Sequence, residues 1–530
     1  MPEIAPESTS RPRLHFCGGM ISGPDLKFSF TDQVWRTLLA KPILAELADQ
    51  SAQIRTLRCA YFDTADHVLY RSGISLSVLL ERRVWRQVVR METRDAGSNP
   101  EEVEAALGSG EPDLGAVSGA TGERLRGLVG NEPLHAVFET VICRSIWQVA
   151  TPDGGAVKAV FDEGEIRAES AALELREARL ELNSGDAATL LSVAVDLVGD
   201  INFGLNTESH AERGYRLLRG ENAPQHPPEK GAGQALSDGE NCAEAFAAAC
   251  HSATRQILHN WEVVSESSDP EGPHQLRIGL RRLRTALSAF RPVIDSPDLR
   301  QLAREARDLA RCVGEVRDLD VLCEEIVGPL SVKTVDEAGF RALHKLLRSQ
   351  TAKRRSRMQR ELRGARWSPL RLRLALLPHG AGWTQDAIAD EHASRPVEEQ
   401  ARLAMQKEWR RARRKAHDLD RLSIEERHEL RKRLKSLRYT AEFFASLYPG
   451  AEMGRFLKRL RRLLDVFGYL NDVAMAERLI DLCRAERQSD SGRDIAAGYV
   501  VGWHSARSQQ AWETVPRRWR ELKRSLHYWM

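Results

Sequence analysis

The sequence predicts an α+β protein in which an N-terminal antiparallel β-sheet or barrel precedes an all-α domain of two related helical bundles. Three observations predict this fold class. Short runs of alternating apolar and polar residues fill the first 220 residues, as in strands. A helical period of about 3.6 residues dominates from residue 240 to the end of the 530-residue chain. One basic helical segment recurs at a fixed offset within this second part.

The N-terminal part, residues 14–220, is expected to hold an antiparallel sheet with helices between its strands. Gly, Asp and Asn break the alternating runs into short segments, which is typical of strands joined by turns. Strands are expected at 25–30, 74–79, 84–90, 157–161 and 178–182, and helices at about 31–48, 122–130 and 186–198.

A linker and a helical domain follow. Residues 221–239 combine Pro, Gly and polar residues without periodicity, which is typical of a flexible linker. The domain at 240–530 is rich in Leu, Ala and Arg. Its helices are expected at 240–264, 274–291, 297–325, 336–363, 396–417, 424–447, 451–486 and 505–527.

The segment from His274 to Arg291 carries two stripes when it is drawn as a helix. One stripe is apolar, and the stripe beside it is basic. A helix that buries one face and aligns cations on the next can hold a long polyanion against a rigid wall. The apolar stripe is Leu276, Leu280, Leu283, Leu287 and Phe290, and the basic stripe is His274, Arg277, Arg281 and Arg284.

The same pattern returns at His428, which lies 428 − 274 = 154 residues further along. At this offset Asp318 also corresponds to Asp472. One gapless offset over about 45 residues is difficult to obtain by chance. We therefore expect two copies of one bundle, repeat 1 at about 240–390 and repeat 2 at about 395–530. The paired basic positions are Arg277 and Arg431, Arg281 and Lys435, Arg284 and Arg438, Arg304 and Lys458, and Arg307 and Arg461.

These aligned cations have two interpretations. A solvated helix face or internal salt bridges would explain a single charge run. Two stripes matched residue by residue favour one groove for an anion, since Arg offers a planar fork and Lys a mobile point charge for phosphate oxygens. Few aromatic residues lie among the cations, which favours a ligand with phosphates and no bases.

His274 and His428 each stand at the expected start of a helix. An imidazole there can cap the backbone, contact an anion or bind a metal, but positions 278 and 432 hold Ile and Lys instead of a second ligand. Asp318, Asp320 and Asp472 are expected to pair with basic residues on neighbouring helices and to hold them in place. No nucleophile or carboxylate pair accompanies them, so no catalytic role is expected for them.

Composition and charge restrict the remaining possibilities. The net charge is only +3, but basic runs at 353–355 and 410–415 indicate an anionic partner for the C-terminal part. The eight cysteines are scattered without CxxC pairs, which favours buried reduced thiols over disulfides or a zinc site. No apolar segment resembles a signal peptide or a membrane span, so a cytoplasmic protein is expected.

Four motifs of the helical part carry a family resemblance. They are His274-x-Leu-Arg-x-x-Leu-Arg-Arg-Leu-Arg284, Arg317-Asp-Leu-Asp-Val321, His428-Glu-Leu-Arg-Lys-x-Leu-Lys-x-Leu-Arg-Tyr439 and Leu470-Asn-Asp472. Residues 240–530 thereby resemble the CHAD domain, the conserved histidine α-helical domain. The resemblance implies two four-helix bundles that bind inorganic polyphosphate and can localise to polyphosphate granules. Its implied binding positions are His274, Arg277, Arg281, Arg284, Arg304, Arg307, His428, Arg431, Lys435, Arg438, Lys458 and Arg461.

The N-terminal part carries a second resemblance in its segments 61–66, 72–76, 161–166 and 211–217. They are similar to the CYTH fold of triphosphate tunnel enzymes, which often precedes CHAD. The family's Glu-x-Glu-x-Lys strand reads Gly23-Pro-Asp-Leu-Lys27 here, its Leu-Arg-Leu-Arg reads Leu76-Ser-Val-Leu79, and His210 replaces a Lys. Each lost contact costs about 2–4 kcal/mol of transition-state stabilisation, so an inactive or very weak domain is expected. The residual catalytic candidates are Asp25, Lys27, Glu177 and Glu181.

Three functions follow as expectations. The first is a protein that binds inorganic polyphosphate and associates with polyphosphate granules and their proteins, without cofactor, bound metal or membrane. The second is an inorganic triphosphatase that uses Mg²⁺ or Mn²⁺ in the CYTH-like domain, with the helical domain recruiting substrate. The third is a nucleic-acid binder, against which the shortage of stacking aromatics argues.

Overall fold

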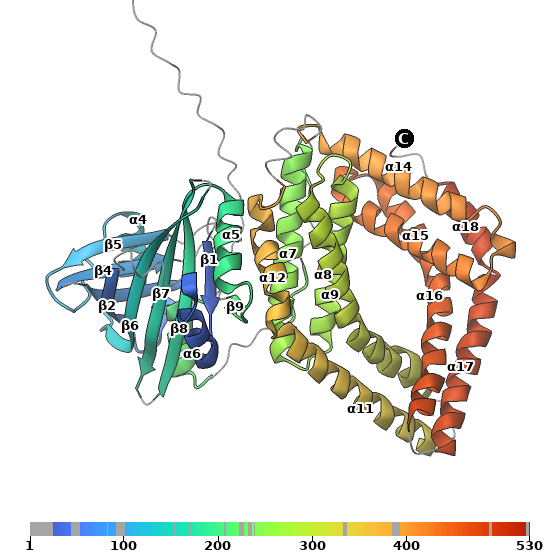
Figure 1. Cartoon of the computed structure of the whole chain (residues 1–530), viewed down its shortest axis with the longest axis horizontal. Helices are drawn as coiled ribbons and strands as arrows, with labels where there is room; N and C mark the ends of the chain where they lie inside the picture. Colours follow the sequence, from blue (N-terminus) through green and yellow to red (C-terminus); the bar gives the residue numbers. More distant parts are fainter. Residues whose placement is uncertain are drawn as a thin grey trace, which may run out of the picture. The chain divides into compact units, whose positions relative to one another are not determined.

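The computed structural model describes residues 25–43, 53–81, 83–91, 101–152, 154–169, 171–205, 208–221, 227–231, 236–237, 239–331, 337–383, 393–486, 490–525 and 529. The chain divides into two compact units. Residues 1–197 with 203–224 form the first, and residues 198–202 with 225–530 form the second. The first unit carries the strands, and the second is helical (Figure 1).

The first unit holds an antiparallel sheet of nine described strands in the order β5-β4-β3-β2-β6-β7-β8-β1-β9. Each neighbouring pair in this order runs antiparallel. The strands are β1 (Asp25–Ser29), β2 (Gln53–Asp63), β3 (Ile74–Glu81), β4 (Val84–Met91), β5 (Glu101–Leu107), β6 (His135–Ala150), β7 (Ala156–Ala168), β8 (Ala171–Ser184) and β9 (Gly204–Leu205).

The expected antiparallel sheet is confirmed. The expectation that it closes into a barrel is wrong for the strands that the structure describes. Strands β5 and β9 are the two edges of the sheet, and no ladder joins them. A barrel forms only where strand tilt and stagger bring the two edges into register. The described strands therefore form an open sheet and not a tunnel closed on all sides.

Three helices of the first unit, α1, α4 and α5, lie near the expected places, whereas α3, α6 and several strands were not predicted. The helices are α1 (Asp32–Leu39), α3 (Val68–Arg71), α4 (Gly119–Val129), α5 (Ala187–Val198) and α6 (His210–Leu218). Residues 44–48 of the first expected helix lie outside the described residues. Strands β2, β5, β6 and β9 were not predicted. In β6 the alternation of buried and exposed residues is lost from Cys143 to Trp147, which hides the period-two signal.

Two of the segments that resemble the CYTH fold meet in the first unit. The Tyr215 hydroxyl on α6 donates to Asp63 at the end of β2, with 2.7 Å between the oxygens. Asp63 also accepts hydrogen bonds from the backbone N–H groups of Thr64 and, in α3, of Leu69 and Tyr70. A Cβ on Gly214 would lie 2.2 Å from the Phe138 ring, so only glycine fits there. These segments therefore anchor α6 on the sheet.

The second unit is built from helices that mostly begin and end close to the expected positions. A π-helical turn at Leu322–Val327 and the short α10 (Gly328–Ser331) extend one of them. The longer helices are α7 (Cys242–Glu266), α8 (Glu271–Phe290), α9 (Pro297–Val321), α11 (Glu337–Leu362), α12 (Ser368–Leu376), α14 (Val397–Lys415), α15 (Ile424–Phe443), α16 (Ala451–Ala485), α17 (Ser491–Trp512) and α18 (Val515–Lys523).

Two expectations about these helices are wrong. The single helix expected at 505–527 is two helices, of which α17 already begins at Ser491. Helix α18 begins at Val515, because Pro516 fits only the first turn of a new helix. Helix α12 was not predicted. Its residues from Leu370 to Leu376 are almost all buried, so the helix shows no amphipathic period.

The helix starts follow the internal repeat. Helix α9 begins at Pro297 and α16 at Ala451, which differ by 451 − 297 = 154. Helix α11 begins at Glu337 and α17 at Ser491, which also differ by 491 − 337 = 154. One hydrophobic core contains residues of both pairs, from Leu319 to Leu347 and from Met475 to Val500. The two copies therefore share this core, while a second core, from Met405 to Trp529, belongs to repeat 2 alone.

The expected flexible linker is wrong for residues 227–231. Glu229 forms an ion pair with Arg255 on α7, at 3.1 Å between nitrogen and oxygen. The Asn260 side chain exchanges two hydrogen bonds with the backbone of Glu229. These contacts fix the segment on α7. Residues 222–226, 232–235 and 238 of the expected linker lie outside the described residues.

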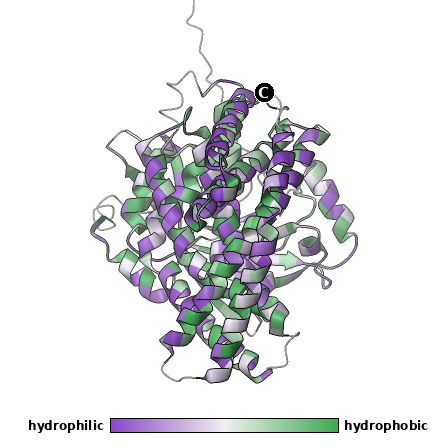
Figure 2. Ribbon diagram, turned by 90° about the vertical axis from the view of Figure 1, so that its right-hand side faces the viewer, coloured by the Kyte–Doolittle hydropathy of each residue, from purple (hydrophilic) through white to green (hydrophobic). Residues whose placement is uncertain are grey.

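None of the described helices has the length and apolarity that crossing a bilayer requires. Figure 2 shows hydrophilic and hydrophobic residues mixed along the helices in view. The seven cysteines that the structure describes are all free thiols, and burial raises the pKa of Cys59 and Cys242 to about 11.

Candidate functional site

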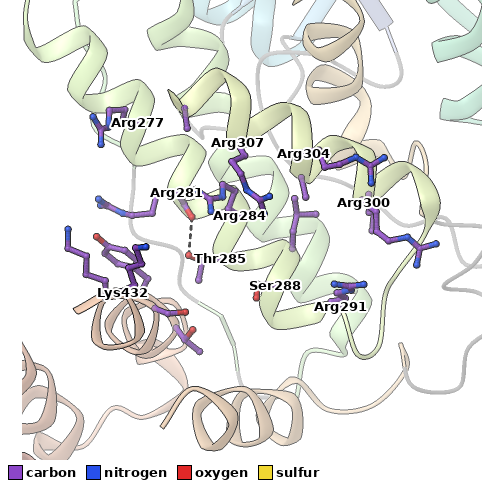
Figure 3. A pocket seen from close by; sticks show the side chains of 18 of the residues that line it. Arg277, Arg281, Arg284, Thr285, Ser288, Arg291, Arg300, Arg304, Arg307 and Lys432 are labelled. Carbon is purple, nitrogen blue, oxygen red and sulfur yellow. Dashed lines mark hydrogen bonds between the residues drawn. The ribbon is translucent and has the colours of Figure 1, made fainter. Parts of the chain in front are cut away.

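A basic groove lies between α8, α9 and α15, with a volume of about 990 Å³ (Figure 3). Its lining includes eleven cationic side chains and one carboxylate, Asp295. Such a surface favours a ligand with many negative charges. The cations are Arg277, Arg281, Arg284, Arg291, Arg300, Arg304, Arg307, Arg311, Lys432, Arg433 and Lys435.

Helical spacing places these cations along the groove. On α8 the groove positions 277, 281, 284, 288 and 291 follow steps of four and three residues, and on α9 the positions 300, 304, 307 and 311 do the same. Residues at these steps share one helix face. Leu276, Leu280 and Leu283 are fully buried on the neighbouring face of α8, so packing holds the basic face in a fixed direction.

Several of the groove cations have no ionic partner within the described part of the chain. These are Arg284, Arg304, Arg307, Arg433 and Lys435. Asp295 instead pairs with Arg291 at 3.5 Å and with Arg300 at 2.9 Å. Cations crowded on one surface without counter-charges repel each other, and an anion that enters the groove relieves this repulsion.

One aromatic residue, Tyr439, joins the basic stripes of the two repeats. The Arg281 guanidinium of α8 lies 4.3 Å from the centre of the Tyr439 ring, and that of Arg438 on α15 lies 4.8 Å from it. Both contacts are within cation–π range. The two stripes therefore meet at this ring, although only part of the second stripe reaches the groove.

Lys435 is the groove residue whose charge is most affected by its surroundings. Burial, followed by the charges of Arg431, Arg438, Arg281 and Arg277, lowers the pKa of its ammonium group to about 8. Two of these arginines belong to α8 and two to α15. Positive charges from both repeats therefore disfavour the charged form of this lysine.

The structure places half of the predicted binding residues in this groove and the other half outside it. Arg431 donates a hydrogen bond to Asn471, with 2.7 Å between nitrogen and oxygen. Arg461 pairs with Glu442 at 3.0 Å, and Arg438 lies 3.8 Å from the same carboxylate. The predicted residues that line the groove are Arg277, Arg281, Arg284, Arg304, Arg307 and Lys435, and those that do not are His274, His428, Arg431, Arg438, Lys458 and Arg461.

The expectation that His274 and His428 open their helices is wrong. Helix α8 begins at Glu271 and α15 at Ile424, so both imidazoles lie inside helices. Burial, followed by nearby charges that include Arg317, lowers the pKa of His274, and burial followed by Lys432 lowers that of His428. Both rings are therefore neutral at pH 7. A neutral imidazole offers a phosphate no net charge.

The three predicted supporting aspartates differ in their contacts. Asp318 bridges Arg277 at 3.2 Å and Arg478 at 3.3 Å, so it links α8, α9 and α16. The buried Asp320 accepts two hydrogen bonds from Arg355, at 3.0 and 3.2 Å. Burial raises the pKa of Asp472, which lies near His504 and Arg431. Asp318 is thus the aspartate that directly holds a groove arginine.

The prediction from the internal repeat missed several groove residues, because it kept only positions that are basic in both copies. Arg291, Arg300 and Arg311 correspond at the offset of 154 to Ala445, Gly454 and Asp465, which carry no positive charge. The regular steps of four and three residues along each helix would have found all three. Lys432 and Arg433 were missed for the same reason, since positions 278 and 279 are Ile and Gly.

The two repeats also differ at one position between the cations. Ser288 lines the groove beside Arg284, and its counterpart at the offset of 154 is Glu442. Glu442 neutralises Arg438 and Arg461, which are the counterparts of Arg284 and Arg307. Arg284 and Arg307 of repeat 1 therefore stay open to a ligand, whereas Arg438 and Arg461 of repeat 2 already face a carboxylate.

The residual catalytic candidates of the first unit lie together on β1 and β8, where Asp25 pairs in register with Glu181 and Lys27 with Arg179. Glu177 contacts Lys27 at 3.4 Å, His210 at 3.0 Å and Arg213 at 2.5 Å. Although burial opposes its charge, the His210 hydrogen bond and these cations lower the pKa of Glu177 to about 2. Its carboxylate is therefore occupied by intramolecular partners.

These residues do not fit a metal-dependent triphosphatase. Among the residues that the structure describes, no group of three or more His, Cys, Asp or Glu side chains is placed to hold a metal ion. Burial and the nearby Glu181 raise the pKa of Asp25 to about 6, and Lys158 holds Glu181 at 2.8 Å. Mg²⁺ requires ionised oxygen ligands that are free to coordinate it. We derive no catalytic step through a metal here.

A protein-family model described as the CHAD domain matches residues 248–481. The CHAD domain from the plant Ricinus communis is 26% identical and covers 56% of this chain and 96% of its own, with a TM-score of 0.48. PptA from Streptomyces chartreusis is 16% identical and covers 53% and 100%, with a TM-score of 0.40. A Hippeastrum protein with a dominant triphosphatase activity is 13% identical and covers 38% and 97%, with a TM-score of 0.27.

Proposed function

Because residues 248–481 form a CHAD domain and hold a groove with eleven cations, we propose that this protein binds inorganic polyphosphate in the groove of α8, α9 and α15. The observation that carries the proposal is the set of groove cations without ionic partners in the described chain. Arg284 on α8 and Arg304 and Arg307 on α9 line the same groove, in which Arg284 and Arg307 point toward each other (Figure 3). A chain with a charge on every phosphate can contact all of them at once.

The same groove disfavours nucleic acid. Base recognition or base stacking requires open aromatic faces or donors aimed at base edges. Tyr439 is the aromatic residue among the groove-lining residues, and Arg281 and Arg438 already lie over its ring. A ligand that consists of phosphates alone needs neither feature. Association with polyphosphate granules follows from this proposal, since a granule presents the same anion at high density.

The test is a binding titration of the full chain with end-labelled long-chain polyphosphate across a salt series. Contacts with phosphates release counterions, so the logarithm of the affinity should fall linearly with the logarithm of the salt concentration. A second titration uses the variant with Glu in place of Arg277, Arg281, Arg431 and Lys435. An affinity that is independent of salt, or equal in the two proteins, would contradict the proposal.

Lys435 predicts a dependence of binding on pH. Its pKa is lowered to about 8, and a bound phosphate chain stabilises the charged ammonium. Below pH 8 the group is already protonated, whereas above pH 8 binding must take up a proton. The affinity should therefore fall as the pH rises through about 8, by up to about tenfold per pH unit. Lys435→Arg stays charged and should lose this fall in the same titration. Identical pH profiles for both proteins would refute the role of Lys435.

The difference between Ser288 and Glu442 predicts opposite effects of two substitutions. Ser288→Glu places a carboxylate among the open arginines and should weaken polyphosphate binding by about tenfold or more, since a charge pair near a surface contributes on the order of 1–4 kcal/mol. Glu442→Ser releases Arg438 and Arg461 and should strengthen binding. Both variants are measured in the same titration as the unchanged protein. A loss of affinity in both, or in neither, would contradict the assignment of the open site to repeat 1.

A further inference from the structure

A second basic surface lies on α14, outside the groove. A cavity of about 540 Å³ there is lined by five side chains, all of them cationic. Helix α14 buries Ala401, Met405, Trp409 and Ala412 on its other face, so packing directs the cations outward. The cations of this α14 surface are Lys407, Arg410, Arg411, Arg413 and Arg414.

Most of the charge on the α14 surface is uncompensated. Arg411 pairs with Glu408 at 2.7 Å. The other four cations have no ionic partner within the described part of the chain. The Glu408 side chain is largely buried, so its carboxylate neutralises Arg411 and adds little negative charge to the open surface. This surface therefore presents the same chemistry as the groove, with cations that lack counter-anions.

A small cavity lies next to both the groove and the α14 surface. It has a volume of about 90 Å³ and shares Ser288 and Thr440 with the groove. It also shares Lys407 with the α14 surface. The three cavities therefore lie in succession along α8, α15 and α14, each sharing lining side chains with the next. The small cavity offers a phosphate chain the Ser288 hydroxyl and Lys407, and its one carboxylate, Glu408, is paired with Arg411.

We propose that a long polyphosphate chain continues from the groove past this small cavity onto the α14 surface, which makes α14 an extension site that favours long chains. The inference rests on the proposed function of the groove. A chain that already occupies the groove brings its next phosphates to α14 at a high effective concentration. Each added contact then strengthens binding without the entropic cost of a second association. A chain that ends within the groove gains nothing from α14.

The geometry distinguishes this extension from a merely solvated basic face. A solvated face would leave the affinity for long and short chains in the same ratio when its charge is changed. An extension site changes that ratio, because only chains that extend past Ser288 reach Lys407. The ratio of long-chain to short-chain affinity is therefore the quantity to measure.

The experiment compares tripolyphosphate with long-chain polyphosphate on the full-length protein. The test variant carries Glu at Arg410, Arg413 and Arg414. Long-chain affinity should fall by about tenfold or more, while tripolyphosphate affinity changes by less than about twofold. A variant with Glu at Lys345, Arg517 and Lys523, which lie outside all three cavities, has the same net charge and should keep the ratio of the unchanged protein.

Each outcome decides between the possibilities. A selective loss of long-chain affinity in the α14 variant alone supports the extension site. Equal losses for both chain lengths, equal losses in the charge-matched control, or no loss at all would overturn it. If the unchanged protein binds neither ligand, the proposed function of the groove fails first. The substituted side chains are largely exposed, so each variant should retain its fold. Far-UV circular dichroism of each variant checks this through the helical signal.

Discussion

Replacing Arg284 and Arg307 together by Glu is expected to lower the affinity for polyphosphate by at least about 100-fold. Both guanidinium groups line the groove and lack an ionic partner in the described chain. Burial, followed by the charge of Arg307, lowers the pKa of Arg284, so the charge of Arg284 is held at an electrostatic cost that an anion relieves. Hydrogen bonds to charged groups contribute about 1.5–3 kcal/mol each, and two reversed charges remove both contacts and add repulsion.

The internal repeat supplies a matched control for this variant. Arg438→Glu with Arg461→Glu changes the same net charge at the positions related by the offset of 154. Glu442 already compensates both arginines, so this pair should cost less than about tenfold in affinity. Both variants are titrated with the same polyphosphate preparation at one salt concentration. Equal losses for the two variants would contradict the assignment of binding to the groove of repeat 1.

Phe290→Ala is expected to lower the free energy of unfolding of the helical unit by about 3–5 kcal/mol. The Phe290 ring is fully buried at the end of α8. Its centroid lies 5.6 Å from that of Phe246 on α7 and 6.0 Å from those of Phe443 and Phe444 of repeat 2. Truncation therefore leaves a cavity where the two repeats meet, and loses edge and tilted aromatic contacts as well.

Denaturant unfolding followed by far-UV circular dichroism measures this loss through the helical signal. Ile424→Ala provides the control, since Ile424 is 74% exposed and its truncation should change stability by no more than about 0.5 kcal/mol. A change below about 1 kcal/mol for Phe290→Ala would show that the two repeats do not depend on this contact.

The sequence allowed the helical unit to be predicted well because its signals are local and repeated. The apolar stripe at Leu276, Leu280 and Leu283 is fully buried, as helical spacing requires. The offset of 154 reappears in the starts of α9 and α16. The repeat could not reveal where the two copies differ in charge. Arg300 and Arg311 were overlooked because their counterparts are not basic, and the neutralising role of Glu442 depends on contacts between α15 and α16.

The sheet unit was less predictable, because strand pairing depends on contacts between distant parts of the chain. Strands β2 and β6 pair along most of their lengths, yet neither was predicted as a strand. The alternation in β6 fails where Arg144 forms a bidentate ion pair with Asp162, at 2.7 Å for both hydrogen bonds. Whether the sheet closes into a barrel depends on its edges, and no local pattern in β5 or β9 encodes that.

Protection of lysines from chemical acylation tests the central claim, that polyphosphate lies in the groove of α8, α9 and α15, most directly. Lys432 and Lys435 line the groove, whereas Lys458 is the counterpart of Arg304 in repeat 2 and lies outside it. Lys435 should react readily without ligand, since its pKa near 8 leaves part of it unprotonated near neutral pH. Mass spectrometry with and without polyphosphate should show strong protection of Lys432 and Lys435 and little change at Lys458. Protection of Lys458 equal to that of Lys435, or no protection of either groove lysine, would contradict the account.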